Sequence, residues 1–246
     1  MPLRAAAVRC YVAVMDRAIV FDVDGTLAET EETHREAFNR AFRQAGLSWS
    51  WDQGLYRELL AVTGGKERIR HFIEAHGATG APQEDRDPFI RALHADKTGA
   101  YTRMVSGGEL ALRPGVRELI NAARKRGYRL AIATTTTPAN VDALLQVAFG
   151  DTGHGLFEVI CAGDSVANKK PAPDVYLRTL EELGLPAADC VAIEDSRNGL
   201  LAARAAGIAT IVTPSLYTRD ERFDEAALVV DDLASLDFAA LESLFR

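Results

Sequence analysis

The sequence predicts an α/β protein in which a parallel β-sheet is covered by helices and a helical segment is inserted after the first strand. From Leu112 onward, short apolar runs alternate with helical patterns that end at glycines, as in chains that form parallel sheets. Residues 31–105 show only helical spacing, broken by glycine, proline and serine. We therefore divide the chain into an N-terminal extension (1–15), an α/β core (16–30 and 106–246) and an inserted helical module (31–105).

Composition and charge fit an ordinary globular protein. The chain has 246 residues, of which 48% are hydrophobic and 26% charged. Its net charge of −7 disfavours a nucleic-acid partner, because such proteins present a basic face. No apolar run approaches a membrane span, and residues 1–16 lack the continuous apolar stretch of a secretion signal. We expect a cytoplasmic monomer with no membrane partner, in which Met15 is an alternative start and residues 1–14 are dispensable.

The first strand is the apolar run Ala18–Phe21, which leads directly into Asp22 and Asp24. Alternate side chains of a strand share a face, so both carboxylates should point into the same space where the sheet ends. Two acids placed together beside a buried strand are costly unless a cation or a proton balances them. Gly25 then allows the backbone to turn sharply away. The pattern predicts a metal-assisted site.

The inserted module reads as four helices. An apolar pattern over residues 37–45 predicts the first of them, and Gly46 ends it. Further helical patterns cover residues 53–61, 66–76 and 87–104. We find no strand signal in this module.

The rest of the core alternates between helix and strand. Helices are expected over residues 116–126, 139–149, 174–183 and 199–206. Strands are expected over residues 130–134, 158–161, 190–193 and 209–212. Ligands of such sheets bind beyond the carboxyl ends of the strands, so the polar residues at those ends are the candidates for chemistry.

Three later strand ends carry such residues. The run Thr134–Thr137 offers hydroxyl and N–H groups to a phosphate, with a helix N-cap as the alternative. The lysine pair 169–170 lies before two prolines that could hold an ammonium group in place, with a solvated basic loop as the alternative. Glu194 and Asp195 could complete a Mg²⁺ site of hard oxygen ligands, with an N-cap at Asp195 or Ser196 as the alternative.

In this order, these motifs resemble those of the haloacid dehalogenase superfamily of phosphotransferases. The resemblance rests on Asp22-Val-Asp24-Gly-Thr, Thr134, Lys170 and Glu194-Asp195, and it extends from Asp16 to the C-terminus. It implies a Rossmann-like core and makes the helical module the family's cap domain.

The resemblance also implies roles for these residues. Asp22 would be the nucleophile that forms an aspartyl-phosphate, and Asp24 the general acid and base. Thr134 would donate to a phosphoryl oxygen, and Lys170 would offset charge on the nucleophile and the phosphoryl group. The implied Mg²⁺ site consists of Asp22, the backbone carbonyl of Asp24, Asp195 and, toward its coordination shell, Glu194. An acid at position 24 favours phosphate-ester hydrolysis or a phosphomutase over dehalogenation.

Within the superfamily, the cap resembles that of CbbY-type sugar phosphatases. The matching segments are residues 27–34, 63–68, 133–138 and 194–199. Characterised members convert xylulose-1,5-bisphosphate, an inhibitor of the carbon-fixing enzyme Rubisco, to xylulose 5-phosphate. A sugar bisphosphate substrate is therefore expected.

A bisphosphate needs two anion sites. One phosphate would lie at the Asp22 end, and the other could meet Lys66 and Arg68 on the cap, whose alternative role is a solvated helix start. Glu31 and His34 could reach the substrate when the cap closes. The remaining residues expected to bind substrate are Gly25, Thr26, Thr135 and Thr136.

Two rival functions remain open at this point. A β-phosphoglucomutase-like enzyme would share the scaffold and the catalytic pair. A non-catalytic phosphate-ligand binding protein would share the scaffold alone, but it would not need Asp22, Asp24, Lys170 and Asp195 together.

Overall fold

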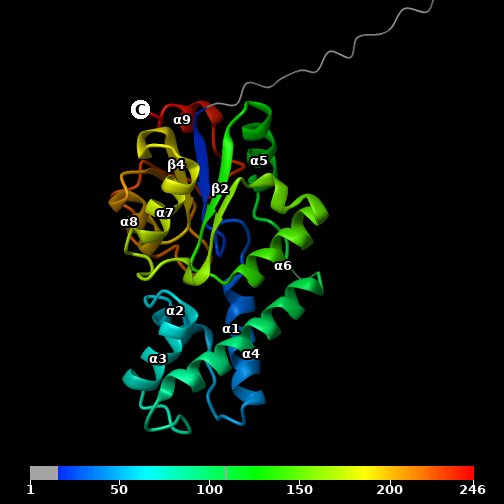
Figure 1. Cartoon of the computed structure of the whole chain (residues 1–246), viewed down its shortest axis with the longest axis vertical. Coiled ribbons are helices and arrows are strands. Elements are labelled where there is room, and N and C mark those ends of the chain that lie inside the picture. Colours follow the sequence, from blue (N-terminus) through cyan, green and yellow to red (C-terminus); the bar gives the residue numbers. More distant parts are fainter. Residues whose placement is uncertain (1–15, 109) are drawn as a thin grey trace, which may run out of the picture.

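A computed structural model describes residues 16–108 and 110–246 (Figure 1). Six strands within these residues form one sheet of order β3-β2-β1-β4-β5-β6, in which each neighbouring pair is parallel. Their bounds are β1 Ala18–Phe21, β2 Arg129–Ala133, β3 Val159–Cys161, β4 Cys190–Glu194, β5 Ala209–Val212 and β6 Leu228–Val229. The α/β prediction is confirmed. The predicted N-terminal extension and the start at Met15 lie outside the described residues.

The helices of the sheet domain cover both of its faces (Figure 1). They are α5 Val116–Lys125, α6 Pro138–Phe149, α7 Asp174–Leu183, α8 Arg197–Ala205 and α9 Phe238–Glu242, with short 3₁₀ turns η1 Gly150–Thr152, η2 His154–Leu156, η3 Gly163–Ser165 and η4 Ala187–Asp189. The sequence reading missed β6, α9 and the 3₁₀ turns. Each is five residues or shorter, too short for a repeating apolar pattern to appear.

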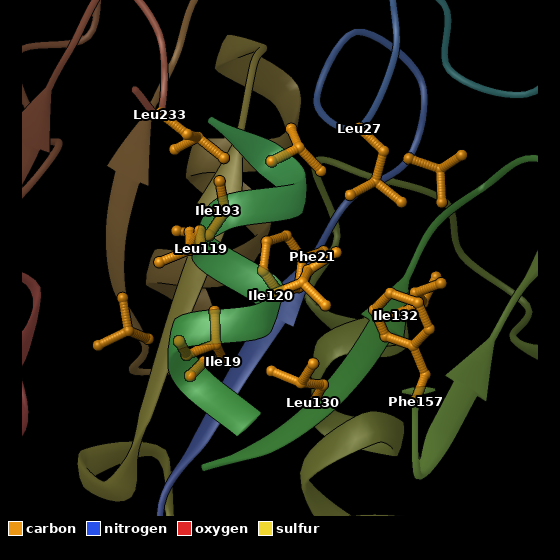
Figure 2. Packing of buried hydrophobic residues seen from close by; sticks show 14 of the residues in the cluster. Ile19, Phe21, Leu27, Leu119, Ile120, Leu130, Ile132, Phe157, Ile193 and Leu233 are labelled. Atoms are coloured by element: carbon orange, nitrogen blue, oxygen red, sulfur yellow. The ribbon is translucent and has the colours of Figure 1, made fainter. Parts of the chain in front are cut away.

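Large apolar side chains fill one face of the sheet (Figure 2). Ile19 and Phe21 of β1 point to this face, where Leu119 and Ile120 of α5 pack against them. The period of two in strand β1 places Ala18 and Val20 on the opposite face. That face is lined by small residues, which lets α7 and α8 approach closely. The central strand is therefore buried on both sides, and its carboxyl end is fixed in place.

The inserted helices lie beyond the carboxyl ends of the strands, at the lower end of Figure 1. They are α1 Glu31–Gln44, α2 Gln53–Leu59, α3 Gly65–Ala75 and α4 Arg86–Ser106. Their core is aromatic, and Trp51 at its centre is fully buried among Phe38, Phe42 and Phe72. The predicted limits, 31 and 105, fall at the start of α1 and one residue before the end of α4. We call α1–α4 the cap from here on; the division into two domains stays a prediction.

Two crossing segments connect the cap to the sheet domain. Ala28 bridges to Asp24 on one side and to Leu112 on the other, so the outgoing and returning chains lie side by side. Arg113 follows immediately, and its buried guanidinium group donates to the carbonyl oxygens of Gly25 and, at 2.7 Å, of Thr213. The connection is therefore held by a buried cation beside the loop that carries Asp22 and Asp24. Among the residues described, none of the helices has the length and apolarity required to cross a membrane.

Candidate active site

Asp22, Lys170 and Glu194 form a buried ionic cluster at the carboxyl ends of β1 and β4. The Lys170 Nζ donates to Asp22 Oδ1 at 2.7 Å, to Glu194 Oε1 at 2.6 Å and to the Ala133 carbonyl oxygen at 2.9 Å. Tyr176 of α7 donates its hydroxyl to the same Glu194 oxygen at 2.5 Å. Lys170 is only 5% exposed, so the alternative of a solvated basic loop does not hold for this residue.

Burial shifts the ionisation of this cluster. It raises the pKa of Asp22 to about 8, although Lys170 pulls the value down. For Lys170, burial acts to lower the pKa, but the adjacent Asp22 and Glu194 carboxylates outweigh it and raise the pKa. The ammonium group therefore stays charged and is shared between two carboxylates.

Asp195 lies beside Asp22 and Glu194. One carboxylate oxygen from each of the three residues lies within 4.8 Å of the others. Burial, followed by repulsion from Asp22 and Glu194, raises the pKa of Asp195 well above its usual range. The alternative N-cap role falls to Ser196, whose Oγ accepts from the Gly199 N–H at the start of α8 and leaves Asp195 free of that task.

These carboxylates fit a hard divalent cation. Three buried carboxylates with a single ammonium group leave negative charge that a cation would balance, and oxygen donors suit Mg²⁺. Gly25 lies close against the group, because a Cβ at that position would come within 2.1 Å of Asp195 Oδ2. Its φ of +80° also favours glycine.

Asp24 is held by residues that precede and begin the cap. Thr30 donates to Asp24 Oδ1 at 2.6 Å, although it stands at the N-cap position of α1 and its hydroxyl does not cap that helix. His34 Nε2 lies 2.8 Å from the same oxygen. Burial alone would raise the pKa of Asp24, but His34 and the hydrogen bond from Thr30 outweigh it and hold the pKa below its usual range.

Lys97 of α4 completes this chain of contacts. Its Nζ lies 2.7 Å from His34 Nδ1, and the imidazole ring stacks on Tyr101 with centroids 4.1 Å apart. A charged ammonium group only donates, so Nδ1 accepts and Nε2 carries the proton that faces Asp24. Burial lowers the pKa of Lys97 to about 8.

The threonine run after β2 follows the same edge of the sheet. Thr134 is buried, and its Oγ1 accepts from the Thr136 N–H at 3.3 Å. Thr136 in turn accepts from Asn140 Nδ2 at 2.8 Å. Thr137 occupies the N-cap position of α6 but makes no side-chain cap bond, so capping does not account for the run.

On the cap side, Lys66 reaches across to the loop after β3. Its Nζ lies 2.5 Å from Asp164 Oδ2, while Lys169 Nζ lies 3.0 Å from Asp164 Oδ1. The side chains of Lys66 and Asp164 are 29% and 67% exposed, so this pair contributes little stability. The two ammonium groups thus converge on one carboxylate at the edge of the cavity.

Arg68 and Glu31 are joined through Tyr56. The Arg68 guanidinium group donates through Nε to the carbonyl oxygens of Leu59 and Val62, and through Nη1 to the Tyr56 hydroxyl at 3.0 Å. Tyr56 donates to Glu31 Oε2 at 2.7 Å. The Nε and Nη1 atoms of Arg68 therefore donate inside the cap.

One cavity between the sheet and the cap brings most of the predicted site residues together. It encloses about 1090 Å³ when its open mouth is included. Its walls include Asp22, Asp24, Glu31, His34, Lys66, Arg68, Thr134, Thr135, Thr136, Lys170 and Asp195. Gly25, Thr26 and Glu194 lie behind the wall, and the buried Thr26 hydroxyl has no hydrogen-bond partner.

Sequence reasoning missed Lys97, Thr30, Tyr176 and Asp164. Lys97 carried a usable signal, since it falls on the apolar face of its helix, three or four residues from Leu93, Ala100 and Tyr101. A lysine in that position needs a buried partner. Tyr176 and Asp164 carry no local signal, because Glu194 and Lys66 lie 18 and 98 residues away from them. Thr30 lies only six residues from Asp24, but no spacing rule pairs them.

Comparison with known proteins agrees with this geometry. A family model described as haloacid dehalogenase-like hydrolase matches residues 17–207. The chain belongs to the haloacid dehalogenase-like hydrolase family. The predicted family, its fold and the prediction that the chain is an enzyme are thereby confirmed.

Three relatives are similar along most of the chain. Protein CbbY of Rhodobacter capsulatus is 52% identical over 93% of this chain and 98% of its own length. Protein CbbY of Cupriavidus necator is 53% identical over 88% of this chain and 85% of its own length. A crystal structure of CbbY from Rhodobacter sphaeroides, in complex with xylulose-(1,5)bisphosphate, is 49% identical, covers 92% of this chain and 99% of its own, and has a TM-score of 0.87.

Proposed function

We propose that this protein is a Mg²⁺-dependent phosphatase that hydrolyses a sugar bisphosphate through an aspartyl-phosphate, with xylulose-1,5-bisphosphate as substrate and xylulose 5-phosphate as product. The observation that carries the proposal is a single cavity with the Asp22 and Asp24 carboxylates on its sheet side and the Lys66 ammonium group on its cap side. The related structure with bound xylulose bisphosphate supports the choice of sugar. We also propose a monomer in the cytoplasm.

Asp22 is the nucleophile of the proposed reaction. Its Oδ1 accepts from Lys170, which leaves Oδ2 for attack on the phosphorus atom. Transfer to a carboxylate replaces one difficult hydrolysis with two easier steps. Lys170 stabilises the carboxylate form, and Thr134 supplies a hydroxyl for an equatorial phosphoryl oxygen.

Asp22 and Asp195, with the Asp24 carbonyl, would hold Mg²⁺. When bound, the ion would neutralise charge on the phosphoryl oxygens. Glu194 is engaged by Lys170 and Tyr176, so we assign it to holding the lysine and only indirectly to the ion. Its predicted role at the edge of the coordination shell stays a prediction.

Asp24 acts as general acid and then as general base. Thr30 and His34 both contact Oδ1, which leaves Oδ2 for the transferred proton. The lowered pKa keeps this carboxylate ionised, so Asp24 must take up a proton from solvent when substrate binds, give it to the leaving sugar oxygen and later accept one from water. His34 belongs to the cap, so this orientation of Asp24 exists when the cap is closed. We therefore assign His34 to Asp24 in addition to its predicted contact with substrate.

Lys66 is the residue that selects a second phosphate. Lys66 and its partner Asp164 both line the cavity, and an ion pair this exposed is easily displaced. We assign Arg68 less direct contact with substrate than Lys66, because its Nε and Nη1 atoms donate within the cap.

A phosphate-release screen tests the proposal. The protein is assayed with and without Mg²⁺ on xylulose-1,5-bisphosphate, sugar monophosphates and β-glucose 1-phosphate. We expect Mg²⁺-dependent release that is fastest on the bisphosphate. Formation of glucose 6-phosphate without phosphate release would favour the mutase, and inactivity on every substrate would favour the non-catalytic binding protein.

A further inference from the structure

The segment Thr213–Thr218, after β5, contacts the cap through one residue and Asp195 through the next. Tyr217 belongs to the sheet domain by sequence, yet it is buried in the aromatic core of the cap. Its ring meets Tyr56 edge to face, with centroids 5.7 Å apart, and its hydroxyl donates to Glu32 of α1 at 2.5 Å. Tyr217 is therefore packed as a member of the cap.

The adjacent Thr218 holds Asp195. Its buried hydroxyl donates to the Asp195 backbone carbonyl at 2.7 Å and accepts from the Ser215 N–H at 2.9 Å. Consecutive Cα atoms are about 3.8 Å apart, so a shift of Tyr217 with the cap also shifts Thr218 and its hydrogen bond to Asp195. One peptide unit thus separates the cap contact from the contact to a candidate metal ligand.

The beginning of the segment is fixed to the sheet domain. Arg113 donates to the carbonyl oxygens of Thr213 at 2.7 Å and Pro214 at 2.8 Å. Any shift of Tyr217 with the cap would therefore be taken up after Pro214, in the turn where the Ser215 N–H donates to the Thr218 hydroxyl.

We propose that Tyr217 and Thr218 are positioning residues that tie the position of the cap to the Asp195 carboxylate, and through it to the affinity for Mg²⁺. The inference rests on the Mg²⁺ site of the proposed function. Coupling between two sites is reciprocal, so Mg²⁺ at Asp195 favours the cap position in which Tyr217 is seated, and the seated cap favours Mg²⁺.

Calorimetric titration of the metal-free full chain with MgCl₂ tests the coupling without any assay of activity. Substitution of groups that orient a metal ligand costs roughly 10- to 100-fold in affinity or activity. We expect Thr218→Val to weaken Mg²⁺ binding by about 10-fold, at the lower end of that range, and Thr218→Ser to bind within about twofold of the unchanged protein. Tyr217→Ala should weaken binding by about three- to tenfold, and Tyr217→Phe, which keeps the ring, by less than about twofold.

Phe72→Ala is the matched control. Phe72 is buried in the same aromatic core at 8% exposure, but it is not adjacent to a contact with Asp195. We expect this variant to lower the melting temperature and to leave Mg²⁺ affinity unchanged. Melting curves identify any variant that fails to fold. If Tyr217→Ala or Phe72→Ala does not fold, the comparison of Mg²⁺ affinity between Thr218→Val and Thr218→Ser decides the test.

Tryptophan fluorescence provides a second readout. Both tryptophans of the chain, Trp49 and Trp51, lie in the cap core, and Trp51 packs on Tyr56 beside Tyr217. Saturating MgCl₂ should change their emission in the unchanged protein and not in Tyr217→Ala. The coupling would be overturned if Thr218→Val and Thr218→Ser bound Mg²⁺ with equal affinity. It would also be overturned if Phe72→Ala weakened Mg²⁺ binding as much as Tyr217→Ala does, or if MgCl₂ left the tryptophan emission of the unchanged protein the same. An unchanged protein that binds no Mg²⁺ would refute the proposed metal site, and the coupling with it, before any variant is compared.

Discussion

Two lysines on opposite walls of the cavity differ in their own burial and in the burial of their partners. Lys170, on the sheet side, is 4% exposed and is shared by Asp22 and Glu194 at 2.7 and 2.6 Å. Lys66, on the cap side, is 29% exposed and pairs with an aspartate that is 67% exposed. The first ion pair cannot open without leaving buried charges unpaired, whereas the second exchanges readily with solvent or with another anion.

The difference separates chemistry from selection. On the sheet wall, buried ion pairs hold Lys170 in a fixed position, as stabilisation of a phosphoryl transition state requires. The cap wall holds its cation with a partner that a phosphate dianion could replace. Substitutions on the sheet wall should therefore abolish turnover, and substitutions on the cap wall should change the choice of substrate.

Asp22→Asn tests the sheet wall with the largest expected effect. Turnover should fall by at least about 10³-fold, because the amide cannot form the acyl-phosphate. The fold should persist, since burial already raises the pKa of Asp22 to about 8 and the neutral amide resembles its protonated form. Steady-state kinetics and circular dichroism measure the two. Full activity in this variant would refute the nucleophile.

Lys170→Met should lose both activity and stability. It leaves Asp22 and Glu194 buried without their cation, a change that costs about 3–5 kcal/mol in other proteins. Denaturant unfolding measures the loss. Lys66→Met is the control, because the Lys66 side chain is 29% exposed and its partner Asp164 is 67% exposed, so the expected cost is below about 1 kcal/mol. Equal losses of unfolding free energy in the two variants would contradict the distinction between a buried and a solvated lysine.

Lys97→Met tests where the two walls meet. The variant should lower kcat by about 10- to 100-fold, because His34 loses the donor that sets its tautomer toward Asp24. Burial lowers the pKa of Lys97 to about 8, so its charge is present below that pH and is lost above it. The part of kcat/KM that depends on the Lys97 charge should therefore fall as pH rises through about 8, while ionisation of Asp22, whose pKa is also about 8, raises the rate in both proteins. The ratio of kcat/KM in the unchanged protein to that in Lys97→Met should fall over this range. A ratio that stays constant would assign the pH dependence to another group.

The same pKa makes a prediction about stability. The unfolded chain binds the Lys97 proton up to its ordinary value of 10.5, whereas the native chain releases it near 8. Between these values the unfolded state binds more protons, so the contribution of Lys97 to the free energy of unfolding rises with pH. Unfolding at pH 8 and 10 should show this slope in the unchanged protein and a smaller one in Lys97→Met.

Lys66→Ala has the smallest expected effect and the most specific one. KM for the bisphosphate should rise by up to about 10-fold, as for loss of one exposed charge contact, with kcat almost unchanged. KM for a monophosphate should change by less than about twofold. An equal rise for both substrates would count against a role at the second phosphate.

The sequence predicted the sheet wall better than the cap wall, for a physical reason. Asp22, Thr134, Lys170 and Asp195 follow strands whose ends meet by the geometry of a parallel sheet, so adjacency could be deduced. The position of the Asp24 carboxylate at the end of β1 was also predicted. Its contacts with Thr30 and His34 were not, because they depend on how the first cap helix packs. Helical spacing predicts a face of a helix, not the neighbour that it meets.

The same limit explains the residues that were missed. Lys97 meets His34 because α1 and α4 pack together within the cap, and Asp164 meets Lys66 across the cavity; the partners lie 63 and 98 residues apart in the sequence. Tyr217 was given no role from the sequence, because no local pattern marks it as a member of the cap core. The prediction that Arg68 meets a phosphate did not foresee the three acceptors within the cap.

Direct detection of the phosphorylated Asp22 tests the central claim. Asp24→Asn keeps the nucleophile, slows the first step because the leaving oxygen loses its acid, and blocks the second because water loses its base. Prolonged incubation with Mg²⁺ and xylulose-1,5-bisphosphate should therefore leave a phosphoryl group on the protein. Intact mass spectrometry after rapid quenching should show one phosphoryl group per chain, labile to hydroxylamine and located on Asp22. The account would be contradicted if Asp24→Asn stayed unmodified while the unchanged enzyme released phosphate. It would also be contradicted if the double variant Asp22→Asn, Asp24→Asn still carried a phosphoryl group.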